Sequence, residues 1–386
     1  MRPRHGDQTG GRGRGRAGGG PGGGQVNVDI AFSRVTQLAI GYWQAKVLFT
    51  LNAAGVFARL GEEPRPLAEV SGGTDPEALT ALLDAGVALG LVTRAAPGAY
   101  TSTELTRRFL DPASPESLAD WVGTMGAWCR PWGRLDEWLR DPGLLDDVAA
   151  TGAGGADERG FVLGMHQYAA RTADAVASAI DLPGGRAQIA DATGGTRTTD
   201  AGGGASAADA GGGTRIADVG GGAGTYSFAL CRRDPGLTSV VLDRPSVLPI
   251  TLECAAGAGL DARVAVAGCD YRTDSFGSGL DAVLLSNVLH QEAPDTVVSM
   301  LERGRAALRP GGRVIVHGHF LEESRTAPMF STLHNISAML LWGAGRGYTV
   351  EEMLALIDRA RLDVERVTPV PESRTTVIVC RERDVR

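Results

Sequence analysis

A glycine-rich loop contains the residues of this sequence that are best placed for chemistry. It reads Ile216-Ala-Asp-Val-Gly-Gly-Gly-Ala-Gly224 and follows directly on an apolar stretch. Glycines allow a sharp backbone turn and let a ligand approach the amide groups at the start of a helix. Asp243 ends the next apolar stretch, 25 residues after Asp218, and a carboxylate there suits the two hydroxyls of a ribose. This order of strand, loop, helix, strand and acid predicts a site for an adenosine-containing cofactor.

The acid inside this loop distinguishes between cofactors. A dinucleotide loop reads G-x-G-x-x-G and cradles a pyrophosphate, whereas this loop reads D-x-G-G-G-x-G, with Asp218 two positions before the glycines. A carboxylate there repels a pyrophosphate and favours a cationic ligand, such as the sulfonium and ammonium groups of S-adenosylmethionine. Asp270, after the third predicted strand, could reach the adenine, with Tyr271 stacking beside it. An NAD-dependent oxidoreductase is therefore disfavoured.

Strands and helices alternate from Thr214 onward, and this alternation determines where the acids and glycines lie. The predicted strands have the sequences TRIADV, TSVVLD, ARVAVAG, GLDAVLLSNVLH and RVIVHGHF. Helices are predicted directly after the glycine loop and over residues 246–257 and 295–308. The pattern predicts an α/β fold, a doubly wound Rossmann-like parallel sheet with helices on both faces. Residues 361–380 add two strands without a helix between them, which predicts an antiparallel hairpin at the last edge.

The N-terminal half has a helical pattern up to a boundary near residue 180. Helices are predicted over 39–60 and 76–89, and the segment LVTRAAPGAYTST reads as two short strands around a Pro-Gly turn. Helices followed by such a wing indicate a winged-helix arrangement, and the acidic charge favours a packing or dimerisation module over a DNA-binding one. Four tryptophans within 18 residues either belong to the core or roof a pocket for a flat ligand: Trp121, Trp128, Trp132 and Trp138.

Composition and charge predict two low-complexity segments and argue against one class of partner. Glycine makes up 55 of the 386 residues, with much of the excess in two islands. Residues 1–26 carry five arginines against one aspartate and predict a disordered basic leader. Residues 192–213 contain imperfect repeats of ADVGGG and predict a low-complexity insertion rather than a functional lid over the site. The rest of the chain is then more acidic than the net charge of −7, which argues against nucleic-acid binding.

Cysteine usage and hydropathy indicate the compartment. Five cysteines without a close pair predict a reduced cytoplasmic protein with neither disulfides nor a cysteine zinc site. No apolar run reaches the ~18 residues that cross a bilayer, so no membrane partner is expected. We therefore expect the leader over 1–26, a helical winged-helix dimerisation and substrate-roof domain over 27–180, and a cofactor-binding catalytic domain over 181–386.

Taken together, these motifs resemble a known family, the S-adenosylmethionine-dependent small-molecule O-methyltransferases of bacterial secondary metabolism with an N-terminal winged-helix dimerisation domain. The resemblance covers residues 30–382 and rests on GYWQAKVLFTLNAAGVF, ADVGGGAGTYS, VVLDRPSV, LLSNVLHQEAPD and ALRPGGRVIVHGHF. It implies a homodimer that methylates a small, aromatic or phenolic metabolite and releases S-adenosylhomocysteine. The residues that it places at the cofactor are Asp218, Gly220, Gly222, Gly224, Asp243, Asp270, Tyr271 and, near the methionine end, Asn287.

The resemblance also assigns the reacting end of the site. His290 matches the histidine that acts as general base and takes a phenolic proton while the oxygen attacks the methyl group. A histidine suits this role because its pKa lies near 7. The substrate pocket is expected to include five further side chains: Trp128, Met165, His166, His334 and Trp342.

The sequence departs from the family pattern around His290. Gln291-Glu292 replaces the usual Asp-Trp, and glycines stand at 318 and 347, where the family has two glutamates that orient the histidine. The loss of both carboxylates should weaken a general base, although Glu292 could substitute. Two alternatives therefore stay open: C-methylation of an activated carbon, beside a 2-oxo acid carbonyl or ortho to a phenol, and a cofactor-binding scaffold without turnover. A metal held by His166, His290 and His334 is disfavoured, since no ligand spacing supports it.

Overall fold

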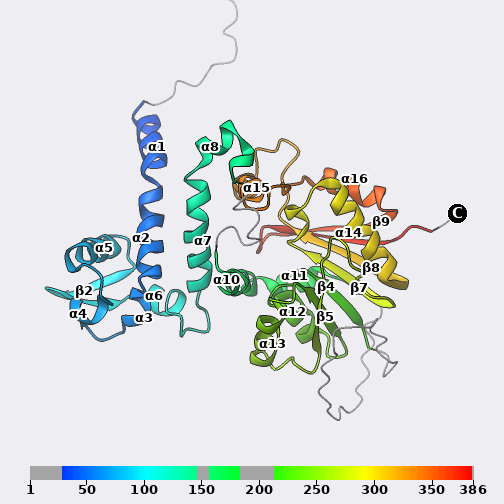
Figure 1. Ribbon diagram of the computed structural model, residues 1–386, viewed down its shortest axis with the longest axis horizontal. Coiled ribbons are helices and arrows are strands. Elements are labelled where there is room, and N and C mark those ends of the chain that lie inside the picture. Colours follow the sequence, from blue (N-terminus) through cyan, green and yellow to red (C-terminus); the bar gives the residue numbers. More distant parts are fainter. Residues whose placement is uncertain (1–27, 146–155, 183–212, 385–386) are drawn as a thin grey trace, which may run out of the picture. The chain divides into compact units, whose positions relative to one another are not determined.

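The computed structural model describes residues 28–145, 156–182 and 213–384 (Figure 1). The predicted leader and nearly all of the predicted insertion over 192–213 therefore lie outside the described residues. The chain forms two compact units, residues 1–45 and 46–386, which are treated separately below. The expected domain boundary near residue 180 stays a prediction. None of the helices that the structure describes is long and apolar enough to span a membrane.

The first unit contains α1 (Val28–Ile40) and the start of α2 (Tyr42–Ala53). The two helices are separated at Gly41, and Gly55, with a φ of 66°, then separates α2 from α3 (Val56–Arg59). A single helix over 39–60 is therefore wrong. The apolar spacing continues through both glycines, and the left-handed backbone at Gly55 interrupts the helical hydrogen bonding.

The second unit begins with short helices around a small antiparallel sheet. The helices are α3, α4 (Leu67–Val70), α5 (Pro76–Ala88) and α6 (Glu104–Phe109), and the strands in spatial order are β1 (Arg65–Pro66), β3 (Ala99–Ser102) and β2 (Val92–Ala96). Both the predicted strand pair and the predicted helix near 76–89 are confirmed. Asp75 caps α5 by accepting a 2.8 Å hydrogen bond from the Ala78 amide. The core here is apolar and includes Leu51, Phe57 and Leu83.

A group of helices follows this sheet and leads to the larger one. They are α7 (Ala119–Trp132), α8 (Leu135–Arg140), a 3₁₀ turn η1 (Pro142–Leu145), α10 (Glu158–Ala170) and α11 (Ala173–Ala179). Helices α7 and α10 pack closely at Gly164, where a Cβ would lie 2.9 Å from the backbone of Trp121. Gln167 on α10 accepts a 3.0 Å hydrogen bond from the Asp120 amide at the start of α7. Beside these contacts, Trp121 of α7 stacks on Tyr168 of α10, with ring centroids 5.3 Å apart.

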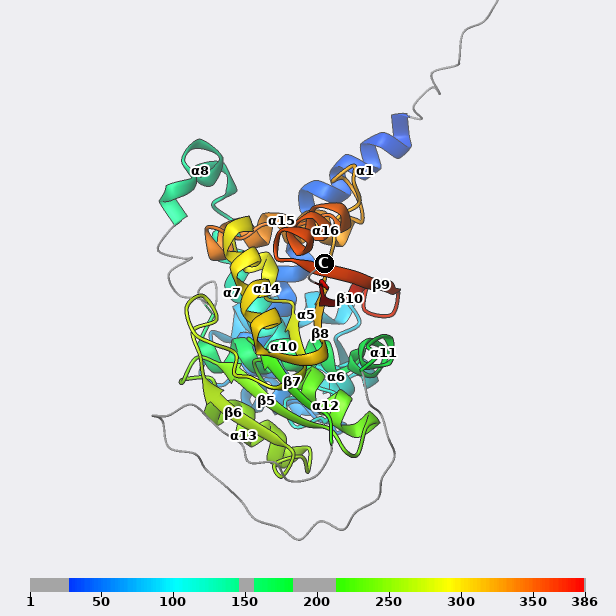
Figure 2. The same ribbon diagram turned by 90° about the vertical axis from the view of Figure 1, so that its right-hand side faces the viewer.

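The larger sheet has seven strands in the order β6-β5-β4-β7-β8-β10-β9 (Figures 1 and 2). Their bounds are β4 (Arg215–Val219), β5 (Thr238–Asp243), β6 (Val264–Gly268), β7 (Leu280–Ser286), β8 (Leu308–Gly318), β9 (Leu362–Val370) and β10 (Thr375–Glu382). The first five strands in this order are parallel, and β10 pairs antiparallel with both β8 and β9. The predicted parallel sheet and the antiparallel hairpin at its end are both confirmed.

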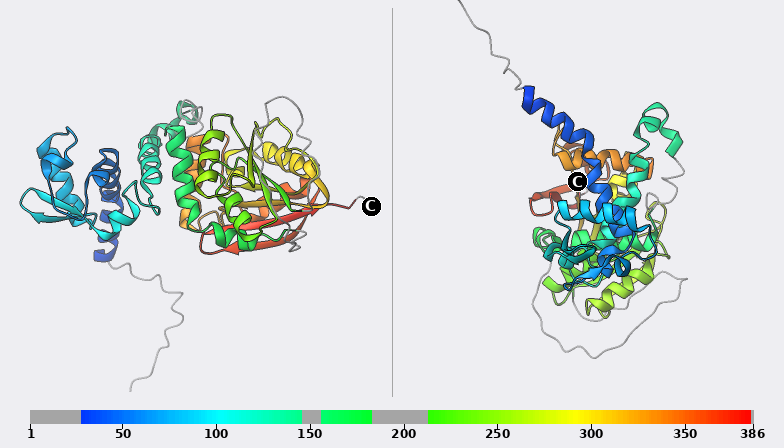
Figure 3. Two further views of the ribbon diagram at one scale, coloured as in Figure 1. Left: turned by 90° about the horizontal axis from the view of Figure 1, so that it is seen from below. Right: turned by 90° about the vertical axis from the view of Figure 1, so that its left-hand side faces the viewer.

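Alternate side chains along each strand divide the core into two layers. One layer includes Ile216, Leu284 and Ile315 and packs against α11 and α12 (Thr225–Arg233), with α13 (Leu248–Gly257) beside β6. The other includes Leu285 and Val316 and packs against α14 (Pro294–Ala307) and α16 (Val350–Arg359). Helices therefore cover both faces of the sheet, which the left-hand view of Figure 3 shows from below. One more helix, α15 (Met329–Trp342), precedes α16.

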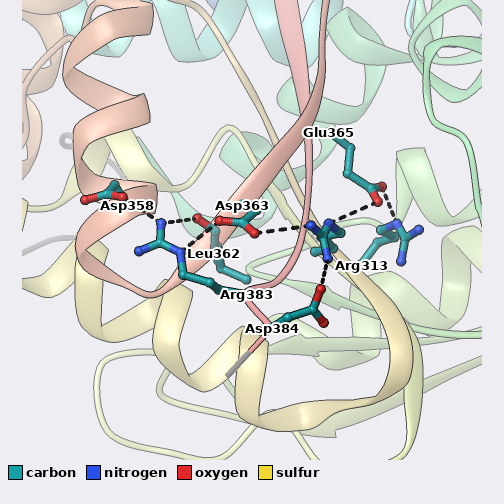
Figure 4. A network of polar contacts seen from close by, with 8 residues as sticks. Arg313, Asp358, Leu362, Asp363, Glu365, Arg383 and Asp384 are labelled. Atoms are coloured by element: carbon teal, nitrogen blue, oxygen red, sulfur yellow. Dashed lines mark hydrogen bonds and ion pairs between the residues drawn. The ribbon is translucent and has the colours of Figure 1, made fainter. Parts of the chain in front are cut away.

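Ion pairs join the last hairpin to its neighbours (Figure 4). Arg383, just past β10, contacts Asp358 of α16 at 2.6 Å and Asp363 of β9 at 2.8 Å. Arg313 of β8 pairs with Glu365 of β9 across the intervening strand. Exposed pairs of this kind contribute little individually, so the buried apolar residues of β9 and β10 stabilise this edge more than the charges do.

Candidate active site

The glycine loop turns between β4 and α12 at the carboxyl edge of the sheet. Gly220, Gly222 and Gly224 all have positive φ values, of 64°, 54° and 85°. At Gly222 a Cβ would meet nothing within 4 Å, so the requirement for glycine there is conformational. At Gly221 a Cβ would lie 2.7 Å from the Asp218 carboxyl carbon, so glycine is needed there for space. The loop therefore exposes backbone toward the cavity beside the start of α12.

Asp243, the last residue of β5, fastens this loop to the neighbouring strand. One carboxylate oxygen accepts a 2.9 Å hydrogen bond from the Gly222 amide and the other a 2.8 Å hydrogen bond from the Arg244 amide. Burial raises the pKa of Asp243, and the two amide hydrogen bonds act in the opposite direction. Each carboxylate oxygen keeps a lone pair that can accept a hydrogen bond from a ligand hydroxyl.

Asp218 lies beneath the loop with 1% of its surface exposed. One carboxylate oxygen accepts a 2.7 Å hydrogen bond from Ser227, and the other is buried and has no hydrogen-bond partner among the described residues. Burial is the main cause that raises the pKa of Asp218 to about 6; the nearby Asp243 acts in the same direction and the Ser227 hydrogen bond in the opposite one. An unpartnered buried carboxylate oxygen is costly, so this position favours a ligand that brings positive charge or a donor.

Tyr271 forms a wall of the cavity opposite Gly220, where a Cβ would lie 3.8 Å from the tyrosine ring. Its hydroxyl donates a 2.9 Å hydrogen bond to Glu292, which is 3% exposed and also pairs with Arg272 at 2.7 Å. The Glu292 carboxylate therefore holds Tyr271 and Arg272. The expectation that it substitutes as a partner for His290 finds no contact to support it within the described chain.

Asn287, just beyond β7, has a strained backbone with a φ of 52°. Its backbone N–H donates a 2.8 Å hydrogen bond to the His317 carbonyl, and its side-chain nitrogen donates to the Tyr226 hydroxyl at 3.3 Å. The side-chain oxygen is buried and has no partner among the described residues. Asn287 thus presents an unused acceptor at the wall of the cavity.

His290 lies in a short 3₁₀ turn, η2 (Leu289–Gln291), and not in the strand itself. Strand β7 ends at Ser286, so the expectation that His290 ends the fourth strand is wrong by four residues. The strand pattern NVLH continues the apolar run, but the positive φ of Asn287 takes the chain out of the sheet. His290 still reaches the carboxyl edge and lines the cavity.

Aromatic rings and two further histidines surround the His290 side chain. The ring centroid of His334 lies 4.6 Å from that of His290, and that of Trp342 lies 5.3 Å away. His319 lies 5.6 Å from His334. Burial is the main cause that lowers the pKa of each imidazole, to about 4 for His334 and well below the ordinary value for His290. The cluster is therefore uncharged at neutral pH.

One cavity of about 3480 Å³ brings together the residues predicted from the sequence. It is lined by every predicted site residue except Gly224, which instead begins α12 and packs against Phe228. Its volume exceeds the ~300–1,000 Å³ usual for one small ligand, so it has room for more than one ligand. Aromatic and sulfur-containing side chains line the part near His290: Met125, Trp128, Phe161, Met165, Phe330 and Trp342.

His166 lies away from this cluster, since its Nδ1 is 2.8 Å from the Thr225 hydroxyl at the start of α12. The described part of the chain contains no group of three or more histidine, cysteine or acidic side chains that could hold a metal ion. Sequence reasoning missed Phe330, which stacks on His334 with centroids 5.9 Å apart, and Thr251, which donates a 2.6 Å hydrogen bond to the Gly222 carbonyl. Neither residue has a local motif that could have revealed it.

These features fit S-adenosylmethionine, the cofactor that the sequence resemblance implies. The unpartnered oxygens of Asp218 and Asn287 suit positive or N–H groups, and the lone pairs of Asp243 suit ribose hydroxyls. Tyr271 offers an aromatic ring beside the loop. The residues present can therefore hold the group at the carboxyl edge of the sheet, where α/β folds bind their ligands.

Comparisons with known proteins agree with this geometry. Residues 205–362 match a family described as an O-methyltransferase domain. The chain is 29% identical over 325 residues to 3-hydroxy-5-methyl-1-naphthoate 3-O-methyltransferase of Streptomyces sahachiroi, covering 82% of this chain and 86% of the relative. It is 30% identical over 358 residues to acetylserotonin O-methyltransferase of Mus musculus, covering 85% and 83%. Human N-acetylserotonin methyltransferase, solved in complex with SAM, has a similar fold, with a TM-score of 0.73 at 22% identity, covering 94% of this chain and 100% of that one.

Asp218→Asn tests the role of the buried carboxylate. At pH 7.5, above its pKa of about 6, Asp218 is ionised, and the isosteric amide should weaken S-adenosylmethionine binding by about tenfold. The difference should shrink at pH 5.5, where the native carboxylate is itself largely protonated. Isothermal titration calorimetry at both pH values measures the effect. Asp174→Asn, at an exposed ion pair with Arg232, is the control, and equal affinity of Asp218→Asn and native protein at pH 7.5 contradicts the prediction.

The buried histidines predict acid sensitivity. The pKa of His317 is lowered to about 3, mainly by burial, while its ring nitrogens bind Ser286 and Thr375 at 2.7 Å and 2.8 Å. In the unfolded chain this histidine takes up a proton below about pH 6.5, whereas in the folded chain it stays neutral. The free energy of unfolding is therefore at its full value above pH 6.5 and falls as the pH drops toward 4. Each such histidine costs about 1 kcal/mol per pH unit in that window. Urea unfolding of native protein and His317→Gln measures this, and an unchanged pH slope in the variant contradicts it.

Proposed function

This chain belongs to the O-methyltransferase family, and we propose that it transfers a methyl group from S-adenosylmethionine to an oxygen of a small aromatic metabolite, with His290 as the general base. The observation that carries the proposal is the position of His290, in the wall of the cavity that also contains the glycine loop. The cofactor supplies an electrophilic methyl group on a positively charged sulfur. The protein must hold that group, orient an acceptor hydroxyl and receive its proton.

The cofactor half of the cavity is assigned to the loop and its acids. Asp243 would hold the ribose, with Asp270 and Tyr271 at the adenine. Asp218 and Asn287, each with an unpartnered buried oxygen, would face the charged methionine end. Gly220 and its neighbours in the loop leave room for the cofactor against the backbone.

The substrate half of the cavity is assigned to α7, α10 and α15. The flat rings of Trp128 and Trp342 and the polarisable thioether of Met165 favour a substrate with an aromatic ring. The relatives act on a hydroxynaphthoate and on acetylserotonin, both aromatic, which supports the same substrate class here. His166 and His334 supply polar groups at the border of this half.

His290 would accept the hydroxyl proton as the oxygen attacks the methyl carbon. Its ring is neutral because burial lowers the pKa below the ordinary value, so a nitrogen lone pair is available at neutral pH. Trp342 and His334 contact the ring edge-to-face and limit its orientation. A positioned hydroxyl and an available acceptor are what the transfer needs from the protein.

His290→Ala should lower the rate of methyl transfer by on the order of 10²-fold, because the hydroxyl then lacks its proton acceptor. The measurement uses S-adenosylmethionine labelled with ¹³C in the methyl group and a panel of hydroxylated naphthoates, indoles and naphthoquinones. NMR of the product shows whether the new methyl group lies on oxygen.

Three results separate the proposal from its alternatives. A change below about threefold in His290→Ala means that the protein acts by proximity alone. A product methylated on carbon favours the C-methyltransferase alternative. Cofactor binding without turnover of any compound favours a scaffold. Native protein and Asp174→Asn are the matched controls for folding and binding.

The quaternary state proposed is a homodimer formed through α1. Four of its apolar side chains, at three- or four-residue spacing, are 66% to 78% exposed: Val28, Phe32, Val35 and Leu38. Such a stripe on one helix face is costly in water and suits the same stripe of a second copy. A cytoplasmic location is also proposed, because all five cysteines, each within the described chain, are free thiols.

Polar substitutions on that stripe should dissociate the dimer. We expect the double variant Phe32→Ser/Val35→Ser to elute as a monomer at micromolar concentration, because both side chains lose apolar area. Size-exclusion chromatography with light scattering measures the mass. Gln37→Asp, on the same helix, is the control and should leave the native mass unchanged. A monomeric native protein contradicts the proposal.

A further inference from the structure

Three imidazoles from three separate elements meet in the wall of the cavity. His290 comes from η2, His319 from just beyond β8 and His334 from α15, with centroid distances of 4.6 Å between His290 and His334 and 5.6 Å between His319 and His334. Phe330 packs against both His319 and His334, with centroids 4.7 Å and 5.9 Å away. We call these three imidazoles the histidine cluster.

The charged groups around the cluster are few, and none that the structure describes is a carboxylate in contact with a ring. On the β9–β10 loop, the Arg374 carbonyl accepts a 3.1 Å hydrogen bond from Nδ1 of His319. The positive charge of the Arg374 guanidinium lowers the pKa of His319. On the segment before α16, the Arg346 amide donates to the His290 carbonyl at 2.9 Å. Directly after η2, Glu292 faces Tyr271 and Arg272.

Glycines stand at the two positions, 318 and 347, where the family resemblance places carboxylates that orient the histidine. Gly347 carries no side chain, and a Cβ there would lie 3.0 Å from the Asn335 side chain, so the position is closed. Gly318 likewise offers no carboxylate, although a Cβ there would meet only Asn287 at 3.7 Å. Among the described residues, no carboxylate therefore contacts the His290 ring to stabilise the proton that it receives.

This arrangement makes each imidazole a weak base. Burial disfavours the charged ring, and a proton on one ring is repelled by partial charge on the next. A general base works best when its pKa lies near the operating pH, and burial lowers the pKa of these rings below that range. An ordinary phenol, with a pKa near ~10, holds its proton too strongly for such a base. A hydroxyl conjugated to a carbonyl does not, because its anion is delocalised.

We propose that the histidine cluster restricts this enzyme to acceptor hydroxyls that are already acidic, such as a hydroxyl conjugated to a quinone or ring carbonyl, and rejects simple phenols. This inference rests on the proposed function. The hydroxyl proton leaves to His290 or to water, and an oxygen lone pair forms the new C–O bond. The C–S bond breaks with its electron pair remaining on sulfur, so the positive charge is lost there.

Two flat bicyclic probes of similar size test the proposal on the native protein. One is 2-hydroxy-1,4-naphthoquinone, which has an acidic hydroxyl, and the other is 2-naphthol, which does not. Transfer of labelled methyl from S-adenosylmethionine is measured from pH 5.5 to 9. At pH 7 we expect at least a tenfold higher kcat/KM for the quinone. Its profile should be flat above pH 6.5, whereas the rate for 2-naphthol should rise with pH toward tenfold per unit.

A matched pair of variants tests whether the missing carboxylate is the cause. His334→Glu places an acid beside His290, and His334→Gln has the same shape without the charge. Relative to the Gln variant, the Glu variant should methylate 2-naphthol about tenfold faster at pH 7 and the quinone less than threefold faster. Near-ultraviolet circular dichroism and S-adenosylhomocysteine binding check that both variants fold, and the native pH profiles decide the matter if they do not.

The outcomes separate this inference from the proposed function. If 2-naphthol is methylated as fast as the quinone with a flat pH profile, the inference is overturned and the O-methyltransferase proposal stands. The same holds if 2-naphthol is methylated and the quinone is not. If S-adenosylmethionine binds but neither compound is methylated, the inference is overturned and the scaffold alternative is favoured. If S-adenosylmethionine does not bind at all, both proposals fail.

Discussion

The hydrogen bond from the Gly222 amide to the Asp243 carboxylate is the contact on which the arrangement of the site depends. It exists because β4 and β5 are parallel neighbours in register, with Val219 opposite Leu242, so their carboxyl ends reach the same edge. The bond fixes a loop whose glycines have positive φ and would otherwise be mobile. Asp218 lies beneath that loop, and the tight approach of Gly221 to its carboxylate depends on the same fixed turn.

The reacting end of the cavity is built on a different principle. Cofactor-side acids are held by backbone amides and a serine, whereas the histidine cluster is held by aromatic packing and by contacts between its own rings. Carboxylates are thus concentrated at one end of the cavity, and none that the structure describes contacts the imidazoles at the other end. The positively charged cofactor requires the acids at its end of the cavity. The acceptor, which must lose a proton, requires the uncharged imidazoles at the other end.

Much of the fold could be predicted because its periodicities are local. The alternation of strands and helices and the helix near 76–89 needed only neighbouring residues. The expected helix over 39–60 failed where Gly41 and Gly55 interrupt an unbroken apolar pattern. Strand β7 was extended too far for a similar reason, since the apolar run in the sequence continues past the turn at Asn287.

The sequence by itself determined the cofactor end of this protein. Its glycines and acids follow consecutive strands, and parallel pairing must bring the ends of such strands together. Only the tertiary structure decided the reacting end. His290, His319 and His334 come from three elements, and no spacing in the chain signals that their rings meet. The same holds for the carboxylate of Glu292, which side-chain packing directs to Tyr271 and not to His290, because contacts between distant segments depend on how whole elements pack.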